Sequence, residues 1–172
     1  AAADGSNAFL ASINIVTRSP LLDAGFSFRT HMGSAQTRNA ALTYSGKVGN
    51  VDQRTTLSFR SNDGFDDGIF LGRSIAINDD SEEISFTSKG LWTPSSSDNI
   101  EFQFGVAESD LGIGKDEYTN RDMSYQYQYL NWSRLTKHGN SLQLIAYHND
   151  LELNDDIKPQ RISEVLGVDD SS

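Results

Sequence analysis

The sequence contains no cysteine and no long apolar run. Without cysteine, the chain has neither a disulfide framework nor a thiolate metal site. Its apolar stretches also stay well below the ~20 consecutive apolar residues that a transmembrane helix requires. These absences leave two classes open, a soluble fold and a transmembrane β-barrel, because a barrel strand turns only alternate residues toward lipid.

Basic residues are scarce: the 172 residues include 14 Lys and Arg against 24 Asp and Glu, which gives a net charge of −10. We therefore expect no nucleic-acid partner, because nucleic-acid phosphates are bound through Lys and Arg. Acidic loops on a solvated surface account for the excess of carboxylates. The N-terminus lacks the basic region and apolar run of a secretory leader. We expect either that a leader was removed or that the chain begins within a larger protein.

No group of residues has the spacing of a catalytic or metal site. His31, His138 and His148 are far apart in the sequence. Residues 112–115 (GIGK) lack the spacing of a phosphate-binding loop. Residues 62–68 (NDGFDDG) offer oxygen ligands, but they lack the closing Glu of a twelve-residue calcium loop. We therefore expect neither an enzyme nor a bound metal or cofactor.

The chain is rich in runs in which apolar and polar side chains alternate. In the clearest run, Ile100, Phe102, Phe104 and Val106 alternate with Glu101, Gln103, Gly105 and Ala107. A period of two residues indicates a β-strand rather than a helix. The sequence therefore predicts an all-β, antiparallel meander of about seven strands, at residues 24–32, 39–48, 53–61, 82–92, 100–107, 122–135 and 141–151.

Some parts of this pattern are irregular. In the sixth run, Met123 and the tyrosines up to Tyr129 share one face, and then Leu130 and Trp132 take over in the opposite phase. Such a change of phase favours a β-bulge. Residues 152–172 carry no strand signal, although 162–166 fit a single helical turn.

The expected connections differ in length in a regular order. Those at 49–52, 94–98 and 137–140 are short, whereas those at 62–81 and 108–121 are longer and polar. The first connection, at 33–37, belongs to the series of the longer ones but is unusually short. Short turns at one end and longer loops at the other are typical of outer-membrane barrels, and runs of about ten residues suit tilted strands that cross ~25 Å of apolar band. Aromatic residues near the run ends fit either interfacial girdles or the core of a soluble sandwich: Tyr44, Trp92 and Trp132.

The N-terminal segment adds a more specific signal. Residues 7–18 read NAFLASINIVTR, and their β-branched residues predict a short strand that stops before Pro20. This segment resembles the end of the plug domain in TonB-dependent outer-membrane receptors, where a Gly-Ala-rich turn leads into an "INIVTR"-like strand. The family usually has Gly at the position of Ala11 and often Tyr-Gly at Ala2 and Ala3, so this sequence departs from the pattern there.

The resemblance implies that residues 1–20 end the plug domain and that residues 21–172 form the first strands of an antiparallel transmembrane β-barrel. The complete barrel would have about 22 strands and enclose a plug. It also implies a fragment without transport activity of its own. The family actively imports scarce nutrients such as ferric siderophores, cobalamin, haem or some glycans across the bacterial outer membrane. Its partners are outer-membrane lipid, the small-molecule or metal-chelate ligand, and the energising TonB–ExbB–ExbD complex.

Substrate contacts in this family come partly from external barrel loops. The loop at 62–81 is long, and its acidic sequence includes apolar and basic residues. Phe65, Phe70 and Arg73 are therefore the candidate substrate-binding residues.

Two other classes share the strand pattern. A soluble antiparallel β-sheet binding module or adhesin would bury the same apolar residues in its own core. A passive outer-membrane porin would have the barrel strands but no plug strand before them.

Overall fold

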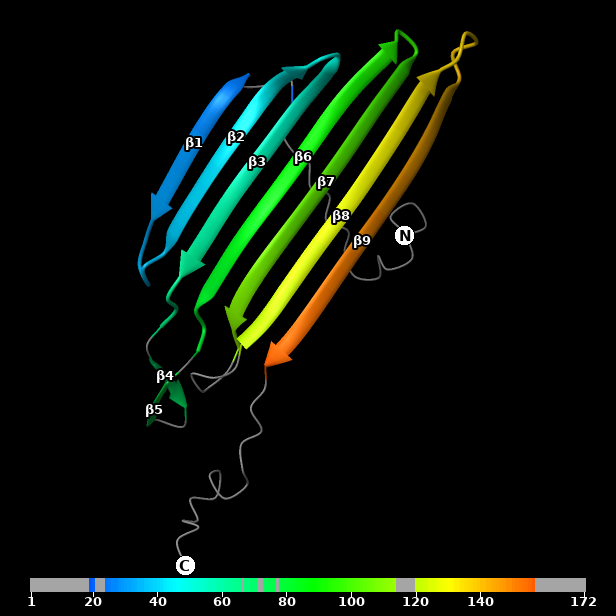
Figure 1. Ribbon diagram of the computed structural model, residues 1–172. Coiled ribbons are helices and arrows are strands. Elements are labelled where there is room, and N and C mark those ends of the chain that lie inside the picture. Colours follow the sequence, from blue (N-terminus) through cyan, green and yellow to red (C-terminus); the bar gives the residue numbers. More distant parts are fainter. Residues whose placement is uncertain are drawn as a thin grey trace, which may run out of the picture.

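The computed structural model describes residues 19–20, 24–65, 67–70, 73–76, 78–113 and 120–156. The segment at 7–18, which carries the family resemblance, lies outside these residues, as does the helical turn expected at 162–166. Seven strands form one antiparallel sheet in the order β1-β2-β3-β6-β7-β8-β9 (Figure 1). They are β1 (Gly25–Met32), β2 (Arg38–Val48), β3 (Val51–Asn62), β6 (Ser81–Ser95), β7 (Asp98–Gly112), β8 (Asn120–Leu135) and β9 (Ser141–Asp156).

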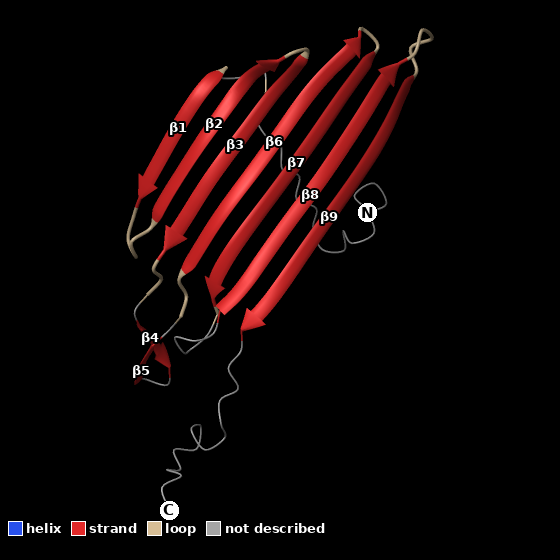
Figure 2. Ribbon diagram, viewed as in Figure 1, coloured by secondary structure: helices blue, strands red, loops and turns tan. Residues whose placement is uncertain are grey.

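The structure confirms the expected all-β class and the seven-stranded antiparallel meander. Strands are the only regular elements in the described residues, and Figure 2 shows the seven strands of the large sheet side by side in one curved layer. The sheet is open there, because β1 and β9 each have a neighbour on one side only. The described residues contain no helix that is long and apolar enough to cross a membrane.

The connections sort by length between the two ends of the sheet with one exception: the connection at 33–37, at the end of the longer loops, is no longer than the one at 136–140. Residues 49–50, 96–97 and 136–140 lie at the short-connection end, at the top of Figure 1. Gly49 takes the first central position of its two-residue turn with a φ of +62°, a conformation that favours glycine. The loops after β1, β3 and β7 lie at the opposite, long-connection end.

Several strands are longer than the sequence pattern predicts. β7 continues to Gly112 and β9 to Asp156, so the loop expected at 108–121 is shorter and the tail expected from 152 begins later. Both extensions remain paired with β8 residue by residue. Backbone pairing with a long neighbour therefore sustains these strands where apolar alternation has already stopped.

The turn expected at 94–98 is reduced to residues 96–97, because β6 runs through Pro94 to Ser95. The pairing of β6 with β7 shifts by one residue between Trp92 and Ser95. Proline has no backbone N–H to donate to the ladder, so an irregularity at this place has a direct cause.

The bulge expected in the sixth run is absent. β8 pairs with β7 and with β9 without a shift along its whole length. Residues 123–129 place their apolar side chains on one face, and Leu130 and Trp132 lie on the other because the backbone alternates regularly. The change of phase is therefore a change in which face of β8 carries the large apolar side chains, while the strand itself stays regular.

The loop expected at 62–81 also contains secondary structure. Strands β4 (Asp67–Phe70) and β5 (Arg73–Ala76) form a separate antiparallel hairpin beyond the ends of β3 and β6 (Figure 1). Of the apolar residues at 69–71 that stand out in the sequence, Ile69 and Phe70 belong to β4, and residue 71 lies outside the described residues.

The register divides the side chains of the large sheet into two faces, because paired residues point to the same side. The apolar face carries Phe26, Phe28, Leu42, Tyr44, Leu57, Phe59, Ile84, Phe86, Phe102, Phe104, Leu130, Leu142 and Leu144. The polar face carries Thr43, Ser45, Arg54, Thr56, Ser58, Ser85, Thr87, Lys89, Glu101 and Gln103.

Across β2 to β7 the apolar face is the more exposed of the two: Leu42 and Leu57 are 46 % and 47 % exposed, whereas Thr43 and Ser45 on the polar face are 5 % and 1 % exposed. On the edge strands β1 and β9 the side chains of both faces are exposed. The described residues include no buried aliphatic, aromatic or methionine side chain. This is the reverse of a water-soluble domain, in which the apolar side of a sheet is covered.

Candidate functional site

The polar face is built from small hydroxyl-bearing side chains at its centre. The Oγ1 atoms of Thr43 and Thr56 lie 3.0 Å apart, and the Oγ atoms of Ser58 and Ser85 lie 2.6 Å apart. Each pair sits directly across two neighbouring strands. These hydroxyls satisfy one another, so the centre of the polar face is flat and needs no covering protein layer to complete its hydrogen bonds.

A row of charged side chains borders this centre toward the short-connection end. The Arg54 guanidinium donates a hydrogen bond of 2.8 Å to the Ser45 hydroxyl. Lys89 Nζ lies 2.8 Å from Glu101 Oε1, and both side chains are mostly buried. The Gln103 amide donates to the same Glu101 oxygen at 2.7 Å. The carboxylate of Glu101 is therefore neutralised and hydrogen-bonded within the sheet.

The apolar face has a row of large side chains near the short-connection end. Residues directly paired across five strands form this row: Val51, Trp92, Ile100, Trp132 and Leu144. The indole N–H of Trp132 donates to Asp98 Oδ1 at 3.1 Å, so its polar atom points toward the end of the sheet. Both tryptophans of the chain therefore lie on one face and in one row.

A group of polar side chains on β3 and β6, within the apolar face, is hydrogen-bonded internally. On β8 and β9 the same face also carries Gln126, Gln128, His148 and Asp150. The Gln53 amide donates to the Thr55 hydroxyl at 3.0 Å and to the Ser88 hydroxyl at 3.2 Å. The Thr55 and Ser88 hydroxyls lie 3.1 Å apart. A closed cluster of this kind lowers the cost of contact with an apolar medium, because fewer polar atoms lack a partner.

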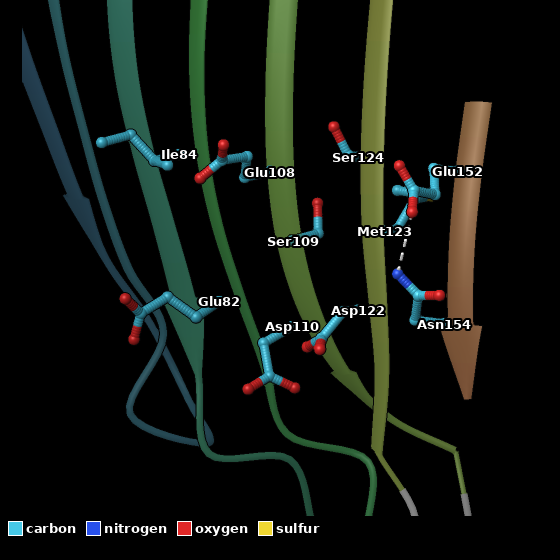
Figure 3. A pocket seen from close by; sticks show the side chains of 10 residues that line it. All are labelled: Glu82, Ile84, Glu108, Ser109, Asp110, Asp122, Met123, Ser124, Glu152 and Asn154. Carbon is cyan, nitrogen blue, oxygen red and sulfur yellow. Dashed lines mark hydrogen bonds between the residues drawn. The ribbon is translucent and has the colours of Figure 1, made fainter. Parts of the chain in front are cut away.

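The side of the sheet that carries the apolar face ends in an acidic hollow at the long-connection end. Figure 3 shows its lining, which belongs to β6, β7, β8 and β9 and encloses about 500 Å³. The carboxylates that contribute are Glu82, Glu108, Asp110, Asp122 and Glu152. The described residues contain no group of three or more His, Cys, Asp or Glu placed to hold a metal ion. We interpret the hollow as the solvated border of the apolar face.

The structure brings two of the three predicted substrate-binding residues together. Phe70 and Arg73 are directly paired across the hairpin of β4 and β5. Phe65 precedes β4, and its side chain is 69 % exposed. A substrate role for these residues remains a prediction.

Polar contacts that the sequence pattern does not reveal fix the base of this loop. The Phe65 N–H donates to Asp79 Oδ1 at 2.8 Å, and the Gly64 N–H donates to Asn62 Oδ1 at 3.0 Å. Asn78 donates to Asn120 at 2.7 Å and so joins the loop to the start of β8. Asn62 belongs to the acidic segment considered for calcium, and its side-chain oxygen accepts the Gly64 N–H.

Comparisons of the chain with protein-family models, with curated proteins and with solved structures find no match.

We predict that the Lys89–Glu101 pair contributes to stability and that the exposed Lys47–Asp52 pair does not. Lys89→Met would leave the Glu101 carboxylate mostly buried without its cation, at a cost of about 2 kcal/mol. Lys47→Met is the matched control, because Lys47 is 67 % exposed and lies 3.9 Å from Asp52; we expect a change below about 0.5 kcal/mol. Urea unfolding followed by far-UV circular dichroism measures both, and equal losses would contradict the prediction.

The ion pair that joins the ends of β8 and β9 predicts a pH dependence. Arg121 donates two hydrogen bonds to Asp155, of 2.5 and 2.7 Å, and holds the pKa of Asp155 below its ordinary value of 3.8. The unfolded chain therefore takes up the proton first as the pH falls. The stabilisation is complete well above pH 3.8 and is lost as the pH drops through the lower pKa of the folded state.

Asp155→Asn removes this ion pair, so the stability difference between the wild type and the variant should shrink on acidification. Unfolding curves at neutral pH and below pH 3.8 measure this difference. Arg121→Gln should give the same pH profile as Asp155→Asn. A difference from the wild type that stays constant down to acid pH would show that Asp155 acts in another way.

Proposed function

We propose that this chain forms part of the wall of a TonB-dependent receptor in the bacterial outer membrane, with the apolar face in contact with lipid. The observation that carries the proposal is the inverted exposure of the two faces: one face exposes large apolar side chains on all seven strands, and on β2 to β7 the opposite face pairs most of its polar groups within the sheet. A lipid bilayer covers such a face without a second protein layer.

The borders of the apolar face support lipid as its occupant. The row with Trp92 and Trp132 lies near the short-connection end, where aromatic side chains suit a membrane interface. The acidic hollow lies at the other end. Between them, β6 is largely apolar on this face from Ile84 to Trp92, roughly 27 Å along the strand and roughly 20 Å along the normal of a tilted barrel. This height is comparable to the apolar band of an outer-membrane barrel.

The transport role rests on the N-terminal segment. The resemblance of residues 7–18 to the end of a plug domain favours an active importer over a passive porin. The ligand would be a scarce nutrient such as a ferric siderophore, cobalamin or haem, and the energy would come from the TonB–ExbB–ExbD complex. A soluble binding module or adhesin remains the alternative if lipid does not cover the apolar face.

The position of both tryptophans on one face allows a direct test of lipid contact. We expect the full 172-residue chain, refolded with bilayers of brominated phosphatidylcholine, to show strong quenching of its tryptophan fluorescence relative to bilayers without bromine. The control variant carries Trp92→Phe, Trp132→Phe and Gln103→Trp, which moves the only indole to the polar face. Its fluorescence should be quenched much less.

Equal quenching of the two proteins, or a chain that melts cooperatively as a soluble monomer without lipid or detergent, would contradict the membrane assignment. The second result would favour the binding-module alternative.

The external loop is predicted to contribute to substrate binding. In cells that express the receptor containing this chain, the triple variant Phe65→Ala, Phe70→Ala and Arg73→Ala should reduce uptake severalfold. The substrates to test are ferric siderophores, cyanocobalamin and haemin. Surface detection of the receptor controls for assembly, and normal uptake of the transported substrate by the variant would remove these residues from the site.

A further inference from the structure

A second apolar surface lies on the polar face, over β8 and β9. Its side chains occupy alternate positions of the two strands: Met123, Tyr125, Tyr127 and Tyr129 on β8, and Ile145, Tyr147, Leu151 and Leu153 on β9. We call these residues the β8–β9 patch. Tyr147 is 75 % exposed and Leu151 is 55 % exposed. On the same face, β2 to β7 carry mainly hydroxyl, amide and charged side chains, so the patch differs from its surroundings.

Small residues of β7 flank the patch on the side of the sheet centre. Tyr127 pairs with Gly105, and its ring occupies the space that a Cβ at Gly105 would need. Ala107 stands opposite Tyr125. The patch is therefore open to an occupant that arrives across β7 from the centre of the polar face.

Polar pairs border the patch at both ends. The ion pair of Arg121 with Asp155 lies at the long-connection end, and the 3.0 Å hydrogen bond from Gln143 to Asn131 lies at the short-connection end. Between these borders the patch is roughly 27 Å long. It contains no charged side chain, and Asn149 is its one polar interruption on β9. A matching occupant is therefore elongated, uncharged and apolar on one side.

The chain before the sheet contains a segment of this character. Residues 5–17 form the longest run of the sequence without Asp, Glu, Lys or Arg. In an extended conformation, Phe9, Ala11, Ile13 and Ile15 of this run would share one side, because side chains alternate along a strand. The segment can thus present a continuous apolar side to the patch.

Two buried residues indicate that the chain enters the sheet from the polar face. Pro20 is fully buried, although it lies outside the single layer of strands. Ser45 on the polar face is also fully buried, and it pairs with Gly25, the first residue of β1. The Arg54 side chain covers Ser45 from one side through its hydrogen bond. A fully buried side chain on an open sheet needs a further cover, and the chain that leads into β1 is nearest.

The segment is long enough to reach the patch from there. β2 and β8 are four strand spacings apart, which is roughly 19 Å. An extended chain advances roughly 3.3 Å per residue, so about six residues cover this distance and bring Phe9 to Ile13 over the patch. The crossing is unobstructed, because the centre of the polar face consists of small hydroxyl-bearing side chains that are paired with one another.

We infer that residues 7–18 cross the polar face and dock on the β8–β9 patch through the side that carries Phe9 and Ile13. Docking removes apolar surface of both partners from water. The inference goes beyond the proposed function, because it concerns the face turned away from lipid and needs no membrane. If the receptor assignment holds, it names the strands of the wall that the end of the plug contacts.

Cysteine cross-linking in the folded full chain tests this docking, because the sequence has no native cysteine. Phe9→Cys or Ile13→Cys is combined with Leu151→Cys, and a short bis-maleimide joins thiols that lie close together. The matched control uses Asp150→Cys in place of Leu151→Cys, since Asp150 is the preceding residue of β9 and lies on the opposite face. We expect intramolecular cross-linking to be severalfold greater with Leu151→Cys.

Trypsin cleavage after Arg18 gives a second readout, because docking shields the segment from the protease. The double variant Tyr147→Ser and Leu151→Ser should release residues 1–18 severalfold faster than the wild type. The control His148→Ser and Asp150→Ser changes the opposite face of the same strand and should leave the rate unchanged. Far-UV circular dichroism verifies that each variant is folded, and mass spectrometry identifies the released peptide.

Three results would overturn the inference. They are equal cross-linking of Leu151→Cys and Asp150→Cys, no cross-linking with Leu151→Cys, and cross-links that form only between molecules. The last result would assign the patch to a second copy of the chain.

The outcome is distinguishable from failure of the proposed function. Intramolecular cross-linking without quenching by brominated lipid would keep the docked segment and reject the membrane location. Quenching without cross-linking would keep the membrane wall and reject the segment as the occupant of the patch.

Discussion

Continuous backbone pairing between neighbouring strands is the constraint on which the rest of this structure depends. Side chains alternate with a period of two, so a slip of one residue between two strands would exchange the two faces of every strand beyond it. The pairing runs without a shift through five of the six strand interfaces of the large sheet. In the remaining interface, between β6 and β7, the shift lies between Trp92 and Ser95, next to the turn. The paired residues from Ser81 to Trp92 are therefore not affected, and their side chains keep their faces.

Because each face keeps its own set of side chains along the sheet, the polar groups of the two faces are satisfied in different ways. On the apolar face even the polar side chains Gln53, Thr55 and Ser88 are satisfied by one another. On the polar face, charges such as Lys89 and Glu101 are paired within the sheet, and aromatic rings rest over glycine rather than over a second layer. One layer of strands thereby satisfies most of its buried polar side chains, the Ser109 hydroxyl excepted, without help from a packed apolar core, which the described residues do not have.

The alternation of apolar and polar residues was sufficient to predict the strands, because in runs such as 100–107 burial and backbone geometry impose the same period. It could not predict where the strands end. Glu108, Ser109 and Asp110 are all polar, and their backbone pairing with β6 on one side and β8 on the other keeps them extended. The tyrosines of β8 were visible in the sequence as one side of a strand. Their assignment to the polar face required the register, since apolar residues occupy both faces of β8 at different heights.

The open edge at β9 has a consequence for how this sheet can grow. An unpaired edge is a template for any further strand, including the same strand of another molecule. If β9 paired antiparallel with a copy of itself so that His148 met its own copy, Leu144 and Ala146 would lie opposite Glu152 and Asp150 of the second copy. Carboxylates would then interrupt an otherwise apolar surface. The carboxylates of β9 thus disfavour pairing with a second copy of this strand. They favour a neighbouring strand whose apolar residues lie beside Leu142 and Leu144 and whose polar residues lie beside the acidic end of β9.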